Sequence, residues 1–428
     1  MDQNSSNLMS HSKDVHIQSI DLETEAFGTV PLINIFKEIQ MFESIFESTM
    51  TLELSVTDSR NLPELANLRG GEKLTIRYKT AGYLNPVELN FHLDTISERT
   101  VTKEKNAIYV MSFVTKELVY DHFNKISRAF NNNNTDNYIK DILQNDEYGC
   151  NSEKELDFEQ SIFVQKMVIP FWSPLQTIRW MKNRCVSALY PGSPFMFFEN
   201  KLGFTLSSME KLFAKEPIKT LSHSPRLNEE NRDVTEDFNK VENYSVKETV
   251  KFLERLRGGA EASRLVTFDL VSKRLSNFEY SFVGNNTRNI TREQQDEIDK
   301  PLVFDDNNIK EKYDSARAFS FKSTELDDAN SFVEAWAKAR ESFLTNLNTI
   351  CVECNMAGDS ELNVGDTVNF SVASFAASGG TFEEDKILSG KYLVTSIAHF
   401  IEHDKYEMKI EICKDTFFRE LQGTNTGE

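Results

Sequence analysis

The sequence predicts an α+β protein, mainly antiparallel β, with two similar β-barrels that α+β segments separate and interrupt. Three observations predict this class. Runs of alternating apolar residues, bounded by turn residues, occur near both ends of the chain. The same pattern of turn and strand recurs in these two regions. Segments with helical spacing of apolar residues lie between them.

Composition limits what the chain can do. Its 428 residues predict about two to four domains, and a hydrophobic content of 39% with 32 Phe supplies the cores. No apolar run approaches the roughly 20 residues that span a bilayer, and the N-terminus lacks the basic and apolar regions of a secretory signal. The net charge of −19 argues against a nucleic-acid-binding surface, although DNA could pass nearby without binding. Solubility is its simplest interpretation.

The first barrel is expected over residues 15–117, after a flexible tail at 1–14. "VHIQSIDLE", "PLINIFKEIQMF" and "STMTLELSVTD" have strand composition, and Leu52, Leu54 and Val56 share one face. "DSRNLPEL" supplies turn residues, and "RGGEKLTIRY" begins the next strand. "VELNFHLDTI" and "AIYVMSFVT" follow with the same alternation, which predicts an antiparallel barrel or sandwich.

An α+β segment is expected over residues 118–214. "DHFNKISRAF" and "DNYIKDILQNDEYG" predict short helices on either side of a loop at "NNNNT". The helix in "WSPLQTIRWMKNRC" has Ser173 at its start as a possible cap and Pro174 in its first turn. "PFMFFENKLGFTLSS" predicts a hairpin, and the polar residues 215–240 predict a linker.

The second barrel is expected from residues 241–262 together with 319–418, with an insertion at 263–318 and a C-terminal tail at 419–428. Phe332, Trp336, Ala339 and Phe343 recur at helical spacing and predict a helix with its aromatic face in the core. Asp327 or Asp328 would cap this helix. The last hundred residues predict four strands, beginning with "NTICVECNM" and ending with "YEMKIEICKDTF".

One turn links the two barrels. Aligning Gly365 with Gly71 places Asp366 on Glu72, and the strands beyond keep their apolar positions. The positions that agree are Val368, Phe370 and Val372 with Leu74, Ile76 and Tyr78; Tyr392, Val394 and Ile397 with Phe91, Leu93 and Ile96; and Tyr406, Met408 and Ile410 with Tyr109, Met111 and Phe113. Three strands in the same order predict an internal duplication, with these four turn residues as its structural site.

No residue pattern predicts catalysis, a cofactor or a metal. The glycine-rich, nucleophile-elbow and zinc-protease motifs are absent from the sequence. "CVEC" lacks the further ligands of a zinc site, and the five cysteines fit a reducing compartment better than a disulfide framework. His399 and His403 fall in a predicted hairpin, where their spacing does not pair them. The expectation is a protein that is not an enzyme, although a site assembled from distant residues stays open.

The stretch "IQMFESIFESTMTLELSVTDSRNLPELANLRGGEKLTIRY" resembles the first tube domain of the central baseplate hub proteins of T-even-type contractile-tail bacteriophages. "SPLQTIRWMKNRCVS", "SPFMFFENKLGFTLSSMEKL" and "GDTVNFSV" with "SGKYLVTSIAHFIEHDKYEMKIEI" are similar to later parts of that family. The resemblance extends over about residues 15–415. The resemblance rests on the pattern of strands, turns and acidic residues rather than on a catalytic motif.

This resemblance implies a structural role in the tail baseplate of a virion, assembled in the host cytoplasm. It implies a homotrimer whose six barrels match a hexameric tail tube. Its partners would be the central spike protein on one side, tail-tube and baseplate proteins on the other, and the end of the tape-measure protein inside. DNA would pass through the channel without specific binding, and acidic strand faces, including Glu72 and Asp94, would repel its phosphates.

Other interpretations stay open at the level of sequence. A bacterial secretion or late-control tail protein would carry an equivalent part, usually fused to a spike. An acidic β-rich cell-wall hydrolase would show a protonated carboxylate in a cleft. A carbohydrate- or receptor-binding module would show exposed aromatic residues on loops.

Overall fold

The computed structural model describes most of both predicted barrels. The described residues are 12–80, 85–102, 106–223, 238–249, 253, 257, 262–281, 317–322, 332–347, 349–374, 384–385 and 387–415. Residues 1–11 of the expected N-terminal tail, the C-terminal tail, and residues 282–316 of the expected insertion lie outside this set. So do Asp327 and Asp328, the expected caps.

The first barrel consists of seven strands and one short helix, α1 (Leu62–Leu65), within the described residues. Its strands are β1 (Val15–Thr24), β2 (Gly28–Pro31), β3 (Phe36–Ser44), β4 (Thr51–Asp58), β5 (Lys73–Thr80), β6 (Val87–Val101) and β7 (Ala107–Val114). They pair antiparallel in the order β3-β4-β7-β6-β5-β1-β2.

The alternation of apolar and polar side chains along these strands determines which face of the sheet lies in the core. Leu52, Leu54 and Val56 of β4 are all fully buried, whereas Thr51 and Glu53 face outward and are exposed. Each such buried aliphatic side chain stabilises the fold by about 1.5–3 kcal/mol relative to exposure. The period of two in the sequence therefore becomes one apolar and one polar face of the sheet.

The second barrel repeats the central part of this arrangement. Its strands are β13 (Thr220–His223), β14 (Val241–Thr249), β18 (Ile350–Ala357), β19 (Thr367–Val372), β20 (Gly390–Ile401) and β21 (Tyr406–Lys414). They follow the order β14-β18-β21-β20-β19-β13, with β13 parallel to β19 and every other pair antiparallel.

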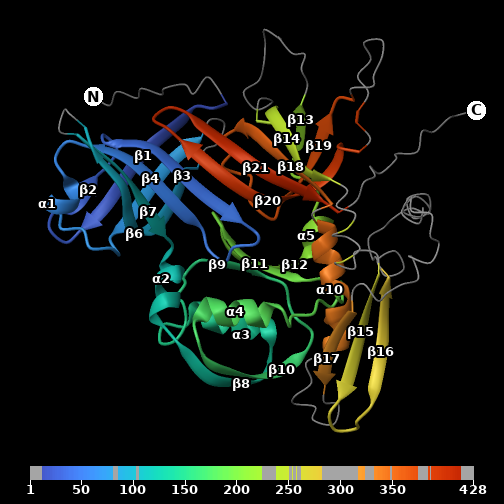
Figure 1. Ribbon diagram of the computed structural model, residues 1–428. Coiled ribbons are helices and arrows are strands. Elements are labelled where there is room, and N and C mark those ends of the chain that lie inside the picture. The colour runs from blue at the N-terminus through green and yellow to red at the C-terminus, as the bar shows by residue number, and fades with distance from the viewer. Residues whose placement is uncertain are drawn as a thin grey trace, which may run out of the picture.

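The two barrels are joined edge to edge. β20 of the second barrel pairs antiparallel with β3 of the first, from Ser396 opposite Ser44 to Ile401 opposite Ile39. One sheet therefore runs through both barrels, blue to red across the upper part of Figure 1. Their buried side chains also form one continuous core. The predicted class, mainly antiparallel β with fewer helices, is confirmed.

An α+β body, green in Figure 1, lies below this sheet. Its elements are α2 (Lys116–Phe123), β8 (Ile126–Asn134), α3 (Thr135–Gln144), β9 (Glu155–Phe158), β10 (Val164–Trp172), α4 (Pro174–Lys182), β11 (Phe195–Asn200), β12 (Gly203–Ser208) and α5 (Met209–Ala214). The loop expected at "NNNNT" was wrong, because these asparagines end β8, whose pairing with β10 overrides their preference for turns. Ser173 precedes α4, but its side chain makes no capping hydrogen bond.

A separate three-stranded sheet follows β14. It contains β15 (Ala262–Asp269), β16 (Leu275–Ser281) and β17 (Arg317–Lys322), in the order β16-β15-β17. Helix α10 (Val333–Leu347) runs beside it in Figure 1. Residues 319–347 were expected in the second barrel; most of β17 lies there but pairs with β15, and α10 contacts this sheet while burying Ala339, Phe343 and Leu347 in the core shared with the barrels. Conversely, β13 lies inside the expected linker and extends the second barrel.

Candidate functional site at the barrel junction

The turns at Gly71 and Gly365 share a positive φ at the glycine and the same backbone hydrogen bonds. Their φ angles are 89° and 84°, in the left-handed region that favours glycine. The Gly71 N–H donates to the Leu93 carbonyl at 2.7 Å, and the Gly365 N–H donates to the Val394 carbonyl at 2.9 Å. In return, the Leu93 and Val394 amides donate to the carbonyls of the acidic residues that follow each glycine, both at 2.9 Å.

The two acidic side chains close their own turns. Glu72 accepts hydrogen bonds from the backbone amides of Arg69 and Gly70, at 2.7 and 2.9 Å. Asp366 accepts one from the Asn363 amide at 3.0 Å. Asp366 is more enclosed, and burial raises its pKa against the opposing effect of this hydrogen bond. A carboxylate two or three residues after its amide donors therefore stabilises each turn, which explains the acid beside each glycine.

The strand registers fix which residues of the two barrels correspond. Ile397 pairs with Ile410 on β21, and Ile96 pairs with Met111 on β7. Because Ile397 aligns with Ile96 through the turn, Ile410 aligns with Met111. The alignment expected for this last strand, which put Ile410 on Phe113, was therefore wrong by two residues. A shift of two keeps every side chain on its face, so apolar alternation alone does not detect it.

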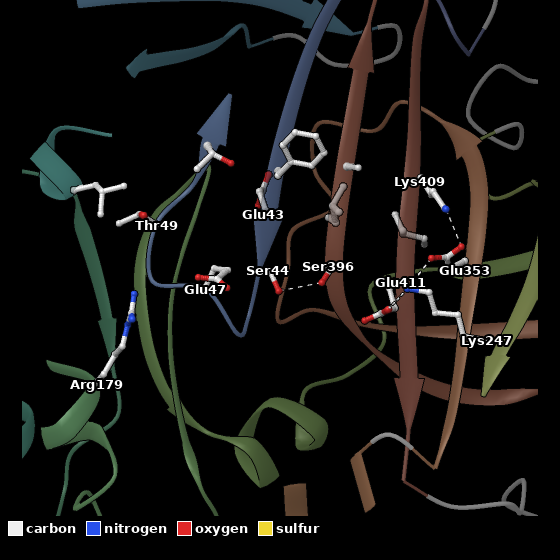
Figure 2. Close-up of a pocket in the computed structure, with 16 residues that line it drawn as sticks. Glu43, Ser44, Glu47, Thr49, Arg179, Lys247, Glu353, Ser396, Lys409 and Glu411 are labelled. Carbon is white, nitrogen blue, oxygen red and sulfur yellow. Dashed lines mark hydrogen bonds and ion pairs between the residues drawn. The ribbon is translucent and has the colours of Figure 1, made fainter. Parts of the chain in front are cut away.

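A cavity of about 580 Å³ lies on the polar face of the sheet, across the junction of β3 and β20 (Figure 2). Phe42 and Ser44 of β3 and Ser396 and Ala398 of β20 form its floor. The hydroxyl groups of Ser44 and Ser396 lie 3.0 Å apart and hydrogen-bond across the junction. Leu118 of α2 and Arg179 of α4 line the side next to the α+β body. Both barrels and the α+β body below therefore line this cavity.

On the face of the sheet opposite the cavity, a buried histidine links the strands of this junction. His399 Nε2 lies 2.8 Å from Glu43 Oε1, and both side chains are shielded from solvent. A carboxylate only accepts, so Nε2 carries the proton, and Nδ1 accepts from the Tyr406 hydroxyl at 2.7 Å. Burial lowers the pKa of His399, although the bond to Glu43 opposes this. The histidine is therefore neutral and links β3, β20 and β21.

Alternating charges border the cavity on the side of the second barrel. Lys247 contacts Glu353 at 2.7 Å and Glu411 at 2.8 Å, and Lys409 contacts Glu353 at 2.8 Å. Burial opposes ionisation of Glu353, but the hydrogen bonds from both lysines lower its pKa overall. Figure 2 shows these side chains in a row across β14, β18 and β21. This row neutralises itself, so it offers neither a free acid nor a free base for catalysis.

A buried charged cluster anchors the first barrel to the α+β body. Lys154 binds Glu117 at 2.7 Å and also binds Glu199, and both carboxylates are almost completely buried. Glu199 further accepts from the Met50 amide, in the turn between β3 and β4, at 3.0 Å. Burial and the nearby Glu117 raise the pKa of Glu199 to about 7, although Lys154 opposes the shift. None of these three side chains lines the cavity.

The cysteines and histidines of the described residues form no metal centre. Within the described ranges, no three His, Cys, Asp or Glu side chains are grouped to hold an ion. Cys351 of β18 and Cys413 of β21 are opposite each other and form a disulfide, while Cys354 is free and buried. His403 packs against Phe36 with ring centroids 4.4 Å apart. The described helices include none with the length and apolar character needed to cross a bilayer.

No family model and no curated protein matches the sequence. Solved structures do match. The tail protein from Neisseria meningitidis MC58 aligns with a TM-score of 0.54 and 7% identity, covering 94% of this chain and 97% of that one. The chain has the fold of a tail protein. The 43 kDa tail protein of prophage MuSo2 from Shewanella oneidensis shares this tail-protein fold, with a TM-score of 0.52, 11% identity, and coverage of 93% and 98%. The resemblance to the hub family is thus confirmed for the fold.

The sequence anticipated the two turns but not the junction between the barrels. Gly71, Glu72, Gly365 and Asp366 lie in matching turns, in separate halves of the sheet, and do not contact the cavity. Glu43, His399 and the charged row were missed. One signal was present, because Glu43 and His399 stand at positions of β3 and β20 whose neighbours at spacing two are apolar. A polar residue on a core face predicts a buried partner.

Proposed function

We propose that this chain is a structural subunit of the baseplate hub of a contractile phage-type tail and is not itself an enzyme. Three copies form a ring that joins the hexameric tail tube to the threefold central spike and leaves a channel for DNA. The observation that carries this proposal is the repeated turn at Gly71 and Gly365, within two barrels that share one sheet. The fold shared with tail proteins supports it.

Symmetry explains why one chain contains the barrel twice. A ring of three chains presents six similar barrels, so a threefold component and a sixfold component both find equivalent contacts. The turns at Gly71 and Gly365 are the equivalent structural positions of the duplicated barrel. The tail tube and other baseplate proteins contact one end of the ring and the spike the other, with the end of the tape-measure protein inside. The site of action is the virion, after assembly in the host cytoplasm.

The polar face of the sheet is the best candidate for the channel wall. Along the junction it carries serine hydroxyls and the row of Lys247, Glu353, Lys409 and Glu411, in which opposite charges alternate. Such a surface offers DNA no continuous basic track. The net charge of −19 adds a general repulsion of phosphate. Passage without specific binding is the behaviour that this surface supports.

The two other classes find less support. Glu199 has the raised pKa that a hydrolase acid needs, but it is buried between Lys154 and the Met50 amide, away from the cavity. Substrate has no route to it in this arrangement. Exposed aromatic residues, which a receptor-binding module needs, include Phe27, Phe123 and Phe171. They come from the β1–β2 turn, α2 and β10, rather than from one loop cluster.

The mass of the assembled protein tests the hub proposal. The full chain is measured by light scattering and native mass spectrometry, at low and moderate salt, alone and with a candidate spike protein. A trimer under at least one of these conditions is the expected result. Moderate salt or the spike should favour it, because a ring of acidic chains repels itself. A strict monomer throughout, or a stable dimer, contradicts the proposal.

A further inference from the structure

Helix α10 lies close against the α+β body, as the orange helix beside the green elements shows in Figure 1. A Cβ added to Gly192, in the loop between α4 and β11, would lie 2.8 Å from the Ala339 Cβ of α10. Just before this helix, the Phe332 ring stacks on Phe163, with ring centroids 3.9 Å apart. Side chains between α10 and the body are therefore enclosed from both sides.

Arg340 of α10 is enclosed in this contact, and one edge of its guanidinium is unpaired. The residue is 9% exposed, and neither Nε nor Nη2 has a hydrogen-bond partner among the described residues. The Trp336 ring covers one face of the guanidinium, with Cζ 4.3 Å from the ring centroid. This cation–π contact uses the face and leaves the N–H groups of the edge unpaired. Nε and Nη2 form one edge, whose parallel N–H bonds fit the two oxygens of a carboxylate or a phosphate.

Other cations surround Arg340. Arg184, just after α4, stacks on Trp180 with its Cζ 3.5 Å from the ring centroid, and its Nη1 donates to the Trp180 carbonyl at 3.1 Å. Arg184 is close enough to oppose the charge of Arg340, and Arg340 opposes the charge of Lys182 at the end of α4. Three positive side chains from two helices therefore meet at this contact.

Among the residues that the structure describes, no acid is bonded to Arg340 or Lys182. Burial, and then repulsion by Arg179 and Arg340, lowers the pKa of Lys182 to about 8, although Glu47 opposes the shift. Burial lowers the pKa of Arg340 to about 10. The chain contains 67 Asp and Glu against 48 Lys and Arg, so acids were not scarce. A buried charge without a partner is costly, and a bound anion would remove that cost.

Local structure accounts for two of these cations but not for Arg340. Lys182 and Arg184 stand at the C-terminal end of α4, where a positive charge interacts favourably with the helix dipole. Arg340 lies in the middle of α10, where the dipole gives it no such role. Lys182 and Arg184 are half-buried, whereas Arg340 is enclosed. An ion would therefore enter beside the first two side chains and reach Arg340 at the inner end.

We propose that Arg340, together with Lys182 and Arg184, binds an oxyanion that presents two acceptor oxygens, as inorganic phosphate and a carboxylate do. The edge formed by Nε and Nη2 binds both oxygens, and the two half-buried cations neutralise the remaining charge. The site lies between α4 and α10, so this inference goes beyond the hub proposal and does not depend on it. Free phosphate and an acidic side chain of a neighbouring protein both supply this chemistry.

Tryptophan fluorescence of the full chain measures this binding. Two of the three tryptophans, Trp180 and Trp336, lie against Arg184 and Arg340, so an ion that draws on either guanidinium should change their emission. Sodium phosphate and sodium acetate are titrated separately, with sodium chloride at equal ionic strength as the reference. A saturable change with phosphate alone assigns the site to phosphate, and a saturable change with acetate as well assigns it to a carboxylate. No saturable change with either ion overturns the proposal.

Arg340→Met should abolish the saturable change while keeping the general stabilisation that phosphate gives to folded proteins. In chloride it should not lower the urea midpoint of unfolding, because it removes a buried charge that has no partner. Arg77→Met is the matched control, since Arg77 already pairs with Glu88 at 2.9 Å, and it should keep the full response. An unchanged response in Arg340→Met, or a lost response in Arg77→Met, overturns the proposal.

Lys182→Met keeps the test decisive if Arg340→Met fails to fold. Lys182 forms no ion pair with the described residues, so its replacement should leave the fold intact. The variant should bind phosphate or acetate more weakly than the wild type, because one of the three cations is lost. Equal affinity in Lys182→Met and the wild type would mean that the ion binds elsewhere, and this outcome also overturns the proposal.

Discussion

The two barrels agree in their central strands and differ in their outer ones. The glycine turn recurs, and the first pairing shift of β6, at Asp94, matches the shift of β20 at Thr395. Outside this part, β1 is ten residues long and antiparallel to β5, whereas β13 is four residues long and parallel to β19. The part common to both barrels is therefore the set of strands that continues through the shared sheet. β1 and β13 lie beyond this common part and complete each core, so they can run in different directions.

The barrels also differ in how they are held. The first is anchored to the α+β body by the buried cluster of Lys154, Glu117 and Glu199. The second carries a row of partly exposed ion pairs on its polar face and a disulfide between β18 and β21. Losing an ion-pair partner should therefore cost far more folding free energy in the buried cluster than in the partly exposed row, because a buried charge without its partner is poorly solvated.

The largest expected difference comes from removing one lysine from each of these two charged groups. Lys154→Met leaves two buried carboxylates without their cation and should lower the free energy of unfolding by about 3–5 kcal/mol. Lys247→Met breaks the partly exposed row and should cost less than about 1 kcal/mol. Urea denaturation of the two variants beside the wild type measures both. Equal losses would show that the buried cluster does not anchor the first barrel to the α+β body.

A smaller difference should separate the two turn glycines. Alanine at Gly71 meets no atom within 4 Å and should cost about 1 kcal/mol, from its positive φ alone. Alanine at Gly365 has the same φ penalty, and its Cβ would also lie 2.6 Å from the Phe198 ring, so it should cost about 1–3 kcal/mol more. Thermal unfolding compares them. Phe198→Leu in the Gly365→Ala background should recover part of the loss, and no recovery would argue against the ring contact.

The smallest effect concerns pH, where Glu199 of the α+β body and His399 of the second barrel should act in opposite directions. Glu199 keeps its proton up to about pH 7 when folded but only to about 4.5 when unfolded, so its contribution to stability is lost as pH rises through this window. Folding lowers the pKa of His399 below 6.5, so its contribution is lost as pH falls below that value. Each changes the slope of stability by at most about 1.4 kcal/mol per pH unit.

Glutamine variants separate these two slopes. Between pH 5 and pH 6.5, Glu199→Gln should make stability rise more steeply with pH than in the wild type, because the falling contribution is gone. His399→Gln should make it rise less steeply. Urea midpoints across this window measure both slopes. A Glu199→Gln profile parallel to the wild type would remove the basis for a raised pKa at Glu199.

The sequence predicted the faces of the strands well and their neighbours poorly. Alternation identified Leu52, Leu54 and Val56 as buried because a strand exposes every second side chain, whatever it pairs with. The same period made a shift of two residues invisible in β21. β13 was placed in a linker because four residues are too few to show a period. The contacts of Glu43 with His399 and of Lys154 with Glu199 join distant segments, and no local pattern specifies such pairs.

The length of the shared strand path has a geometric consequence. Eight strands run without a break from β14 through β20 and β3 to β6. In the proposed ring, three copies would contribute three such runs to the wall of the channel. With strands about 4.8 Å apart and tilted by about 40°, the wall would measure about 50 Å across between backbones. The width of the passage then follows from the strand count and tilt, so substitutions on the polar face would alter its charge while leaving its diameter nearly constant.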